Sequence, residues 1–278
     1  MIQHAVSARD ALDGAVTALG AAGCETPRLD AEVMLAHALG VGRLALLADL
    51  DRPVQGPAVR AFQSAVRRRS VDREPVAYIT GRRAFRHLEL AVDARVLIPR
   101  PETELLVEVG LELPDATRVH DAGTGSGAVA LALKHERPGL IVSASDASRD
   151  ALAVAIANRD RLGLDVPMRE DDLARAPGEA EVVLCNPPYV AETERGALAP
   201  ELRHEPADAL FAGPDGLAAI RRLAAGAAAW TGVRGLAVEV GAGQAAPARG
   251  LLAAAGFGRI EVREDLAGVE RVVVAWRR

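Results

Sequence analysis

The chain has few aromatic residues, almost no lysine and only two cysteines. Aromatic residues make up 3% of its 278 residues, so a core must be built from Ala, Leu and Val. Hydrophobic residues still reach 50%, which predicts a folded chain. Lys134 is the one lysine among 33 basic residues. We interpret this scarcity as a bias of genomic composition, because no function would remove lysine everywhere.

The two cysteines, Cys24 and Cys185, form no Cys-x-x-Cys pair. This excludes a disulfide framework and is typical of a reducing compartment. The first residues lack an apolar segment that directs secretion, and no uncharged apolar run is long enough to span a membrane. We therefore expect a soluble, cytoplasmic protein with no membrane partner. We take it to be a monomer, although nothing in the sequence determines the oligomeric state. We expect no metal site, because the histidines lack metal-ligand spacing. They are His4, His37, His87, His120, His135 and His204.

The net charge of −5 is the opposite of what binders of duplex nucleic acid usually carry, so we expect no direct nucleic-acid partner. One stretch, from Arg60 to Arg86, is nevertheless rich in arginine. Either it contacts a protein partner or it is a solvated helix face. If it contacts the partner, charge reversal at Arg67–Arg69 should weaken the interaction with that partner.

Hydrophobic periodicity divides the chain into three parts. Residues 1–75 have helical spacing only, which predicts a small N-terminal helical bundle. The helices expected there include residues 43–48 and 57–70. Alternation of apolar and polar residues from Phe85 to Val92 predicts a β-hairpin inside a linker, residues 76–100. Residues 101–278 form the main domain.

After Ala116 strands and helices alternate, which predicts a parallel sheet covered by helices on both faces. The last two strands are joined by only six residues, so they should pair antiparallel. A mostly parallel, seven-stranded, Rossmann-like α/β sheet ending in such a hairpin is the architecture of class I methyltransferases. The strands are expected at residues 118–121, 140–145, 166–169, 181–185, 235–239, 259–264 and 271–276. The helices of this part are expected at residues 127–136, 149–162, 215–229 and 244–255.

A glycine-rich turn follows the first of these strands, at Asp121–Gly127. Glycine lets the backbone turn tightly and approach a ligand, and the exposed amides at a helix start favour polar or anionic ligand groups. The turn alone suits a nicotinamide cofactor equally well. Asp121 is either part of this site or a solvated strand end. The residues expected to bind a cofactor are Gly123, Thr124, Gly125, Ser126 and Gly127.

Two acidic positions extend this cofactor site. Asp146 lies 19 residues beyond Gly127, which suits a carboxylate that accepts hydrogen bonds from both ribose hydroxyls. Its alternative role is a helix cap. Asp172 and Leu173 follow the third strand. If the cofactor contains adenine, Asp172 is placed to accept a hydrogen bond from the adenine amine and Leu173 is placed to pack on the adenine ring. For Asp172 an N-cap role is an equal alternative.

The most specific feature is Asn186-Pro187-Pro188-Tyr189, which follows an apolar strand. Two prolines fix the backbone and remove two amide donors, leaving carbonyl groups, and the side chain of Asn186 offers a further carbonyl. Such acceptors can hold both hydrogens of a planar NH2 group, and Tyr189 can stack on it. Asn186, Pro187 and Tyr189 are therefore the expected catalytic residues, and Pro188 joins them in binding the substrate. The alternative is an ordinary Pro-Pro turn capped by Asn.

Binding both hydrogens of an NH2 group in this way, which we call the grip, favours methyl transfer to a weakly nucleophilic nitrogen. Holding both N–H groups orients the nitrogen and stabilises the positive charge that develops on it. The same grip suits the amine of adenine or cytosine, so a nucleic-acid amino-methyltransferase is the alternative function. Such enzymes flip the base and usually carry a basic recognition region. An NAD-dependent oxidoreductase is a weaker alternative, because nothing else in the chain supplies a hydride-transfer site.

Nearly end to end, the chain resembles the release factor glutamine methyltransferases, the PrmC or HemK family. The discriminating segments are Glu74–Gly81, similar to an EPxxYIxG motif, and Val96–Glu104, which matches VLIPRPETE closely. Further similar segments are Thr26–Glu32, Glu205-Pro206, Gly213–Leu217, Glu239–Gly241 with Gln244, and Asp265 with Gly268 and Arg271. The sequence departs from the family at Ala84, at Arg86-His87 and at Leu173, which stands where an aromatic residue is common.

The resemblance implies S-adenosylmethionine as the cofactor and S-adenosylhomocysteine as the product. It implies methylation of the glutamine in the Gly-Gly-Gln tripeptide of peptide-chain release factors, which would be the protein partner. It also implies that Gly123–Gly127, Asp146 and Leu173 bind the cofactor, that Asn186 touches both ligands, and that Pro187–Tyr189 hold the glutamine. Arg100 and Glu102 would order the wall of the pocket, with helix-start electrostatics as an alternative role for Glu102.

Overall fold

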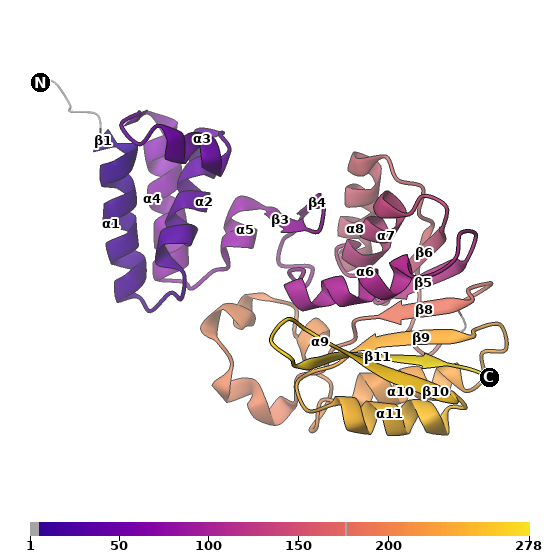
Figure 1. Cartoon of the computed structure of the whole chain (residues 1–278). Helices are drawn as coiled ribbons and strands as arrows, with labels where there is room; N and C mark the ends of the chain where they lie inside the picture. The colour runs from indigo at the N-terminus through magenta and orange to yellow at the C-terminus, as the bar shows by residue number, and fades with distance from the viewer. Residues whose placement is uncertain (1–5, 176) are drawn as a thin grey trace, which may run out of the picture. The chain divides into compact units, whose positions relative to one another are not determined.

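The structure is a computed structural model that describes residues 6–175 and 177–278 (Figure 1). The chain forms two compact units. The first runs to Gly81 and also includes Pro200–His204, and the second contains Arg82–Ala199 and Glu205–Arg278. In the described ranges, no helix combines the length and the apolar character needed to cross a membrane.

Helices make up most of the first unit, as the periodicity predicts. They are α1 (Ala8–Ala21), α2 (Pro27–Leu39), α3 (Arg43–Ala48), α4 (Pro57–Ser70) and α5 (Val76–Thr80). Ser7 begins α1 by accepting a hydrogen bond from the amide of Asp10 at 3.1 Å, and Gly40 ends α2 in the left-handed conformation. Leu12 and Leu19 of α1, Leu35 of α2 and Phe62 of α4 belong to one buried core.

Two features of this unit differ from the sequence-based expectation. A two-stranded ladder joins β1 (Val6–Ser7) to β2 (Pro53–Val54), where only helices were expected. The 3-10 helix η3 (Pro200–His204) belongs to the first unit although the chain on both sides of it belongs to the second. Its Glu201 accepts from Arg69 at 2.8 Å and from Arg73 at 2.5 Å, so ion pairs hold it within the helical unit.

The second unit begins with a hairpin, β3 (Arg82–Phe85) and β4 (Leu88–Ala91), which confirms the hairpin predicted around Phe85. Its main sheet has seven strands in the order β10-β11-β9-β8-β5-β6-β7. The strands are β5 (Arg118–Ala122), β6 (Ile141–Asp146), β7 (Met168–Glu170), β8 (Val182–Cys185), β9 (Gly235–Glu239), β10 (Arg259–Glu264) and β11 (Glu270–Trp276). All neighbours are parallel except β11, which pairs antiparallel with both β9 and β10. The Rossmann-like seven-stranded fold is therefore confirmed.

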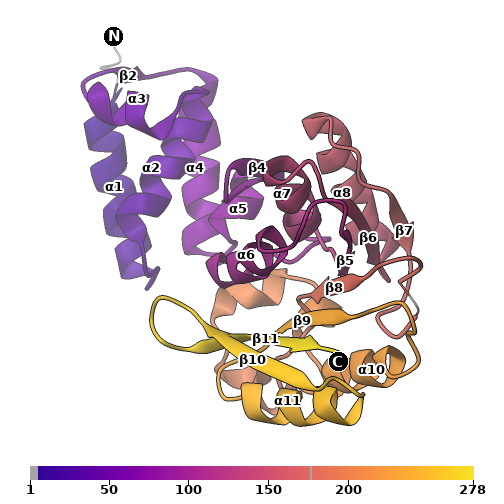
Figure 2. The same cartoon turned by 45° about the vertical axis from the view of Figure 1, so that its right-hand side comes forward.

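Helices cover both faces of this sheet (Figures 1 and 2). On one face lie α6 (Glu104–Leu111), α7 (Ala128–Glu136) and α8 (Arg149–Leu162), and on the other lie α10 (Ala218–Ala227) and α11 (Ala245–Ala254). Three short elements, η1 (Pro101–Thr103), η2 (Glu192–Ala197) and α9 (Ala207–Leu210), lie in the loops. The helix expected from Asp215 begins only at Ala218, because the Asp215 carboxylate instead accepts from the amide of Leu217 in the preceding turn.

The sheet order brings the two main sequence motifs together. Ala122, the last residue of β5, is paired with Cys185, the last residue of β8. Gly123 of the glycine turn follows β5 directly, and Asn186 follows β8 directly. Because β5 also pairs with β6, which ends at Asp146, all three segments meet at the carboxyl edge of the sheet, where open α/β sheets bind ligands.

Candidate active site

A cavity of about 670 Å³ lies at this carboxyl edge. It is lined by the glycine turn, by Asp146, Asp172 and Leu173, and by Asn186, Pro187 and Pro188. The structure therefore brings together every predicted site residue except Gly127 and Tyr189, which do not line it. The volume is in the range of pockets that enclose small molecules.

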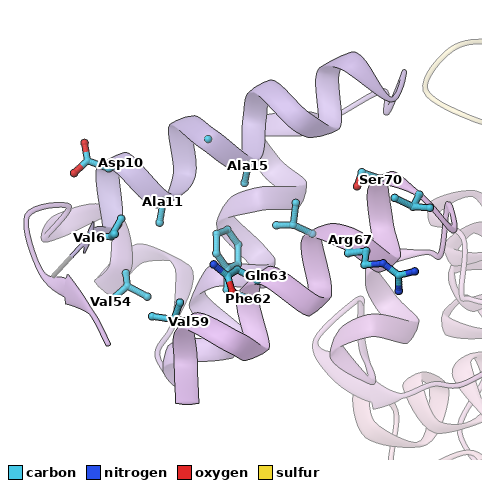
Figure 3. A pocket seen from close by; sticks show the side chains of 13 residues that line it. Val6, Asp10, Ala11, Ala15, Val54, Val59, Phe62, Gln63, Arg67 and Ser70 are labelled. Atoms are coloured by element: carbon cyan, nitrogen blue, oxygen red, sulfur yellow. The ribbon is translucent and has the colours of Figure 1, made fainter. Parts of the chain in front are cut away.

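A second cavity, of about 520 Å³, lies in the helical unit (Figure 3). Valine and alanine side chains from α1, α4 and the β1–β2 ladder line most of it. Its polar lining residues are Asp10, Gln63, Arg67 and Ser70. None of the residues predicted to carry chemistry lies there, so the cavity of the second unit is the candidate active site.

The glycine turn is held in a shape that side chains would disturb. Gly123, Gly125 and Gly127 have φ angles of 76°, 56° and 87°, which are left-handed values that favour glycine. A Cβ on Gly127 would lie 2.8 Å from Cδ1 of Leu131, so glycine also permits close packing against α7. Asp121 is not a solvated strand end: its buried carboxylate accepts from the Thr124 hydroxyl at 2.6 Å and braces the turn.

Asp146 is placed at the centre of this turn. One carboxylate oxygen accepts from the amide of Gly125 at 2.8 Å, and the other accepts from the amide of Ser148 at 2.9 Å. Burial raises the pKa of Asp146 above its usual value, against the lowering effect of these amides. Each oxygen keeps a second lone pair, so the capping role and a ribose-binding role are compatible.

Asp172 takes part in a local turn. Its carboxylate accepts from the amide of Ala174 at 2.9 Å and forms an ion pair with Arg222, and both contacts lower its pKa. Leu173 lies against the glycine turn, because a Cβ placed on Gly123 would be 3.4 Å from Cδ2 of Leu173. Leu173 thus presents an apolar side chain to the glycine turn, beside the Asp172 carboxylate, which is already paired with Arg222.

Asn186 presents an acceptor without a partner. Its Nδ2 donates to Oγ1 of Thr103 at 3.1 Å. Its Oδ1 is buried and has no hydrogen-bond partner in the ranges that the structure describes. A buried acceptor of this kind costs free energy unless a ligand satisfies it, so it marks a binding position in the cavity. Pro187 is buried and Pro188 is half-buried beside it.

Tyr189 lies behind the cavity lining and supports this loop. Its hydroxyl is 3.4 Å from Oε1 of Glu239, and its carbonyl accepts from Nε2 of Gln244 at 2.9 Å. Burial raises the pKa of Tyr189 above its usual range, so the hydroxyl stays protonated and can donate. The stacking role that the sequence suggests for Tyr189 stays a prediction, since the ring does not line the cavity.

Several functional contacts were not assigned a role from the sequence. Thr103, Glu239 and Gln244 stood in segments similar to the family, but nothing in those segments predicted contact with Asn186 or Tyr189. Arg100 pairs with Glu205, whose other oxygen accepts from the amide of Ile98 at 3.0 Å. That Arg100 and Glu102 order the wall of the pocket stays a prediction. Acidic, histidine and cysteine side chains form no metal-binding cluster among the described residues.

Comparison with known proteins identifies the family. Residues 10–81 match the PrmC N-terminal domain and residues 101–216 match the methyltransferase small domain. The chain is 40% identical to the release factor glutamine methyltransferase of Rhodospirillum rubrum over 274 residues, which covers 96% of this chain and 84% of that protein. It is 46% identical to the enzyme of the same name from Burkholderia pseudomallei, covering 87% of this chain and 90% of that protein.

A structural comparison agrees with this at the level of the fold. A methyltransferase from Pyrococcus furiosus superimposes with a TM-score of 0.52 at 13% identity, covering 70% of this chain and 91% of that one. Relatives at 40% and 46% identity, which this chain covers over 84% and 90% of their length, confirm the assignment made from the sequence motifs. The chain belongs to the release factor glutamine methyltransferase family.

Proposed function

We propose that this enzyme transfers a methyl group from S-adenosylmethionine to the side-chain amide nitrogen of the glutamine in the Gly-Gly-Gln tripeptide of peptide-chain release factors. The observation that carries the proposal is the buried, unpartnered Oδ1 of Asn186 in a cavity shared with the glycine turn and Asp146. Only a donor such as the NH2 of a substrate amide satisfies that oxygen.

The residues of the turn suit this cofactor. Gly123, Gly125 and Gly127 make a bend without side chains at the start of α7, and the start of a helix favours an anionic group such as the carboxylate of a methionine moiety. Asp146 has lone pairs left for the two ribose hydroxyls. Leu173 offers an apolar surface for the adenine ring, and Thr124 and Ser126 complete the lining. S-adenosylhomocysteine is the expected product. When bound, S-adenosylmethionine supplies an electrophilic methyl carbon on its sulfonium.

The catalytic role of the protein is to orient the nucleophile. An amide nitrogen has a delocalised lone pair, so it reacts only when it is held against the methyl donor. Asn186 accepts one N–H of the glutamine and the carbonyl of Pro187 accepts the other, which stabilises the charge that develops on nitrogen. The methylated nitrogen then loses a proton readily, so no strong base is needed. Pro188 lines the cavity beside them, and Tyr189 supports the loop through its contacts with Glu239 and Gln244.

The proposal also gives each part of the chain a role. We assign residues 1–75 to recognition of the release factor, residues 76–100 to the hairpin linker and residues 101–278 to methyl transfer. The enzyme acts as a monomer in the cytoplasm and makes no direct contact with nucleic acid. Membership of this family argues against the alternative function, a nucleic-acid adenine or cytosine amino-methyltransferase.

A transfer assay tests the proposal. Purified protein and S-adenosylmethionine labelled in the methyl group are incubated with a release factor, with its Gly-Gly-Ala variant, or with DNA. We expect label in the intact release factor alone, placed on the glutamine by mass spectrometry. The substitution Asn186→Ala should lower the rate by about a hundredfold or more, because it removes the acceptor. Label on DNA alone, or equal label on the Gly-Gly-Ala variant, would overturn the assignment.

A further inference from the structure

Asn158 lies on α8 and is completely buried, with 0% of its surface exposed, and it is not part of the lining of the candidate active site. Its Nδ2 donates to the carbonyl of Ser126 at 2.9 Å and to the carbonyl of Ala91 at 3.0 Å. Its Oδ1 accepts from the amide of Ala91 at 2.8 Å and from Nη2 of Arg161 at 3.2 Å. An amide group has two N–H donors and two lone pairs on its oxygen, so every hydrogen-bonding position of Asn158 is used.

These contacts fix the orientation of the Asn158 amide. Turned over, it would place its oxygen against the carbonyls of Ser126 and Ala91, and its N–H groups against the donors of Ala91 and Arg161. Buried polar groups that lose their hydrogen bonds in this way cost free energy. Asn158 therefore joins Ser126 of the glycine turn to Ala91, the last residue of β4, in one arrangement.

Ser126 lies in the part of the glycine turn that needs such support. The peptide group between Ser126 and Gly127 precedes a glycine whose φ is 87°, and glycine adopts positive and negative φ about equally readily. Sterics alone therefore allow this peptide group to flip, which would exchange the directions of its carbonyl and its N–H. Two hydrogen bonds hold it: the Gly127 amide donates to the carbonyl of Thr124 at 2.8 Å, and the Ser126 carbonyl accepts from Asn158.

The direction of the Ser126 carbonyl decides which group the cavity presents to an anionic ligand. Ser126 lines the cavity and Asn158 does not, so the bond between them directs the carbonyl away from the lining. A flipped peptide group would turn a carbonyl oxygen toward the carboxylate of the methionine moiety proposed to lie at the start of α7. Because both oxygens are negative, the observed direction favours binding.

The other contacts of Asn158 hold the hairpin. β4 forms a two-stranded sheet with β3, in which Ala91 pairs with Arg82. By contacting both the N–H and the carbonyl of Ala91, Asn158 reproduces the pair of bonds that a further antiparallel strand would make. Nη2 of Arg161 also donates to the carbonyl of Glu89, two residues earlier in β4. One edge of β4 is therefore fastened to α8.

We infer that Asn158 is a positioning residue for the cofactor and that it couples the glycine turn to the β3–β4 hairpin. The inference rests on the proposed function for the identity of the cofactor. Asn158 acts through Ser126 and does not itself touch the cofactor. Because coupling is reciprocal, a cofactor that stabilises the turn also stabilises the hairpin, and an ordered hairpin favours cofactor binding.

Two substitutions separate the two contacts. Asn158→Asp keeps the size of the side chain and its acceptors for Ala91 and Arg161, but a carboxylate has no N–H for the carbonyl of Ser126. Arg161→Met is the matched control, because Arg161 contacts Asn158 and the hairpin and makes no hydrogen bond to the glycine turn. Asn158→Ala removes both contacts without burying a charge, and it serves as the test should Asn158→Asp not fold.

Calorimetry measures the dissociation constant of each protein for S-adenosylhomocysteine, with folding checked by circular dichroism. We expect both Asn158 variants to raise it about tenfold, as for the loss of a buried hydrogen bond that holds the turn. Arg161→Met should stay within about twofold of the wild type. An unchanged dissociation constant in the Asn158 variants would overturn the inference.

Steady-state kinetics distinguishes positioning of the cofactor from a general loss of structure. In the Asn158 variants the KM for S-adenosylmethionine should rise with the dissociation constant. At saturating S-adenosylmethionine, kcat and the KM for the release factor should stay within about threefold of the wild type. A loss that falls equally on kcat and on both KM values would show a structural role alone, and would overturn the inference.

Hydrogen exchange of the Ala91 amide tests the coupling without a protein substrate. This amide keeps its acceptor in Asn158→Asp, and only the bond to Ser126 is lost. Each protein receives S-adenosylhomocysteine at the same multiple of its own dissociation constant, so that general stabilisation by the ligand is equal. The ligand should slow exchange at Ala91 at least about fivefold more in the wild type than in Asn158→Asp.

The outcomes separate the inference from the proposed function. Equal slowing of the Ala91 amide in the wild type and in Asn158→Asp would refute the coupling and leave the proposed function standing. A wild type that binds S-adenosylhomocysteine, shows the expected exchange and does not methylate a release factor would refute the proposed function and support the coupling.

Discussion

The side chain of Gln244 holds the carbonyl of Tyr189 in place. Its Nε2 donates to that carbonyl at 2.9 Å, while its Oε1 accepts from the amide of Gly241 at 3.0 Å. Gln244 thus connects the loop after β9 with the end of the Asn-Pro-Pro-Tyr segment. Because Tyr189 is fixed from behind, the backbone that carries Asn186 cannot withdraw from the cavity without breaking these contacts.

The substitution Gly216→Ala should disturb this support. Gly216 has a φ of 73°, and a Cβ there would lie 2.2 Å from the Tyr189 carbonyl oxygen and 2.6 Å from Nε2 of Gln244. We expect kcat/KM to fall by about tenfold or more, because displacement of Tyr189 moves the grip on the substrate. Gly243→Ala is the control, since Gly243 has a φ of 80° and no atoms within 4 Å of such a Cβ.

Both variants introduce the same backbone strain, on the order of 1 kcal/mol, so the melting temperature should fall in both. Steady-state kinetics with a release factor then separates the clash from the strain. Equal activity of the two variants would show that the contact of Gly216 with Tyr189 has no role in positioning the site.

The substitution Asp146→Ala should weaken cofactor binding. It removes the acceptor of the amides of Gly125 and Ser148, and with it the carboxylate proposed to hold the ribose. We expect the dissociation constant for S-adenosylhomocysteine to rise on the order of a hundredfold in calorimetry, as for the loss of hydrogen bonds to a charged group. Asp165→Asn, in an exposed loop, is the control. An unchanged affinity in Asp146→Ala would leave Asp146 with the capping role alone.

Local signals in the sequence were sufficient for most of the fold. The helices α3, α4 and α8 have the bounds that were predicted, and for α8 the reason is visible: Ser148 caps its start and Gly163 ends it in the left-handed conformation. The β1–β2 ladder was missed because two residues are too few for a period of two to be seen. The membership of Pro200–His204 in the helical unit was missed because it depends on ion pairs across more than 100 residues.

The site was predictable where a motif is contiguous and not where it depends on contacts between distant residues. The glycine turn and Asn186 were found because their neighbours in sequence define them. Thr103 lies 83 residues from Asn186, so its contact required the order of the strands and the placement of η1. The carboxylate of Asp172 is paired with Arg222, 50 residues away, which no local pattern indicates.

The substitution Glu239→Gln should stabilise the protein at alkaline pH. Burial raises the pKa of Glu239 from 4.5 to about 7, so the ionised form is disfavoured in the folded state relative to the unfolded state. The contribution of Glu239 to the free energy of unfolding of the wild type is complete below pH 4.5. It is lost as the pH rises through about 7. Glutamine stays neutral, so the free energy of unfolding at pH 8 should exceed that of the wild type by about 3 kcal/mol.

Urea unfolding at pH 5 and pH 8 measures this difference, which should nearly vanish at pH 5. Glu194→Gln is the control, because Glu194 is exposed and its substitution should leave the pH dependence of stability unchanged. A Glu239→Gln protein that is less stable than the wild type at pH 8 would show that the charge on Glu239 is well compensated in the fold.

The arginines of α4 should separate into two classes when they are replaced. Arg69 is buried and pairs with Asp30 at 2.7 Å and with Glu201 at 2.8 Å, whereas Arg67 is exposed. Charge reversal of Arg67–Arg69 together would therefore change both the stability of the fold and any contact with the partner. Arg69→Ala leaves the buried carboxylate of Asp30 unpaired, so we expect a loss of about 3 to 5 kcal/mol in the free energy of unfolding.

The substitution Arg67→Glu instead tests recognition of the release factor. Its effect on stability should stay within about 0.5 kcal/mol, because the side chain is at the surface. If α4 contacts the partner, the KM for the release factor should rise about tenfold at low ionic strength and recover toward the wild-type value with added salt, while the affinity for S-adenosylhomocysteine stays constant. An unchanged KM would leave α4 as a solvated face, and Arg69 would then serve only to hold η3 in the helical unit.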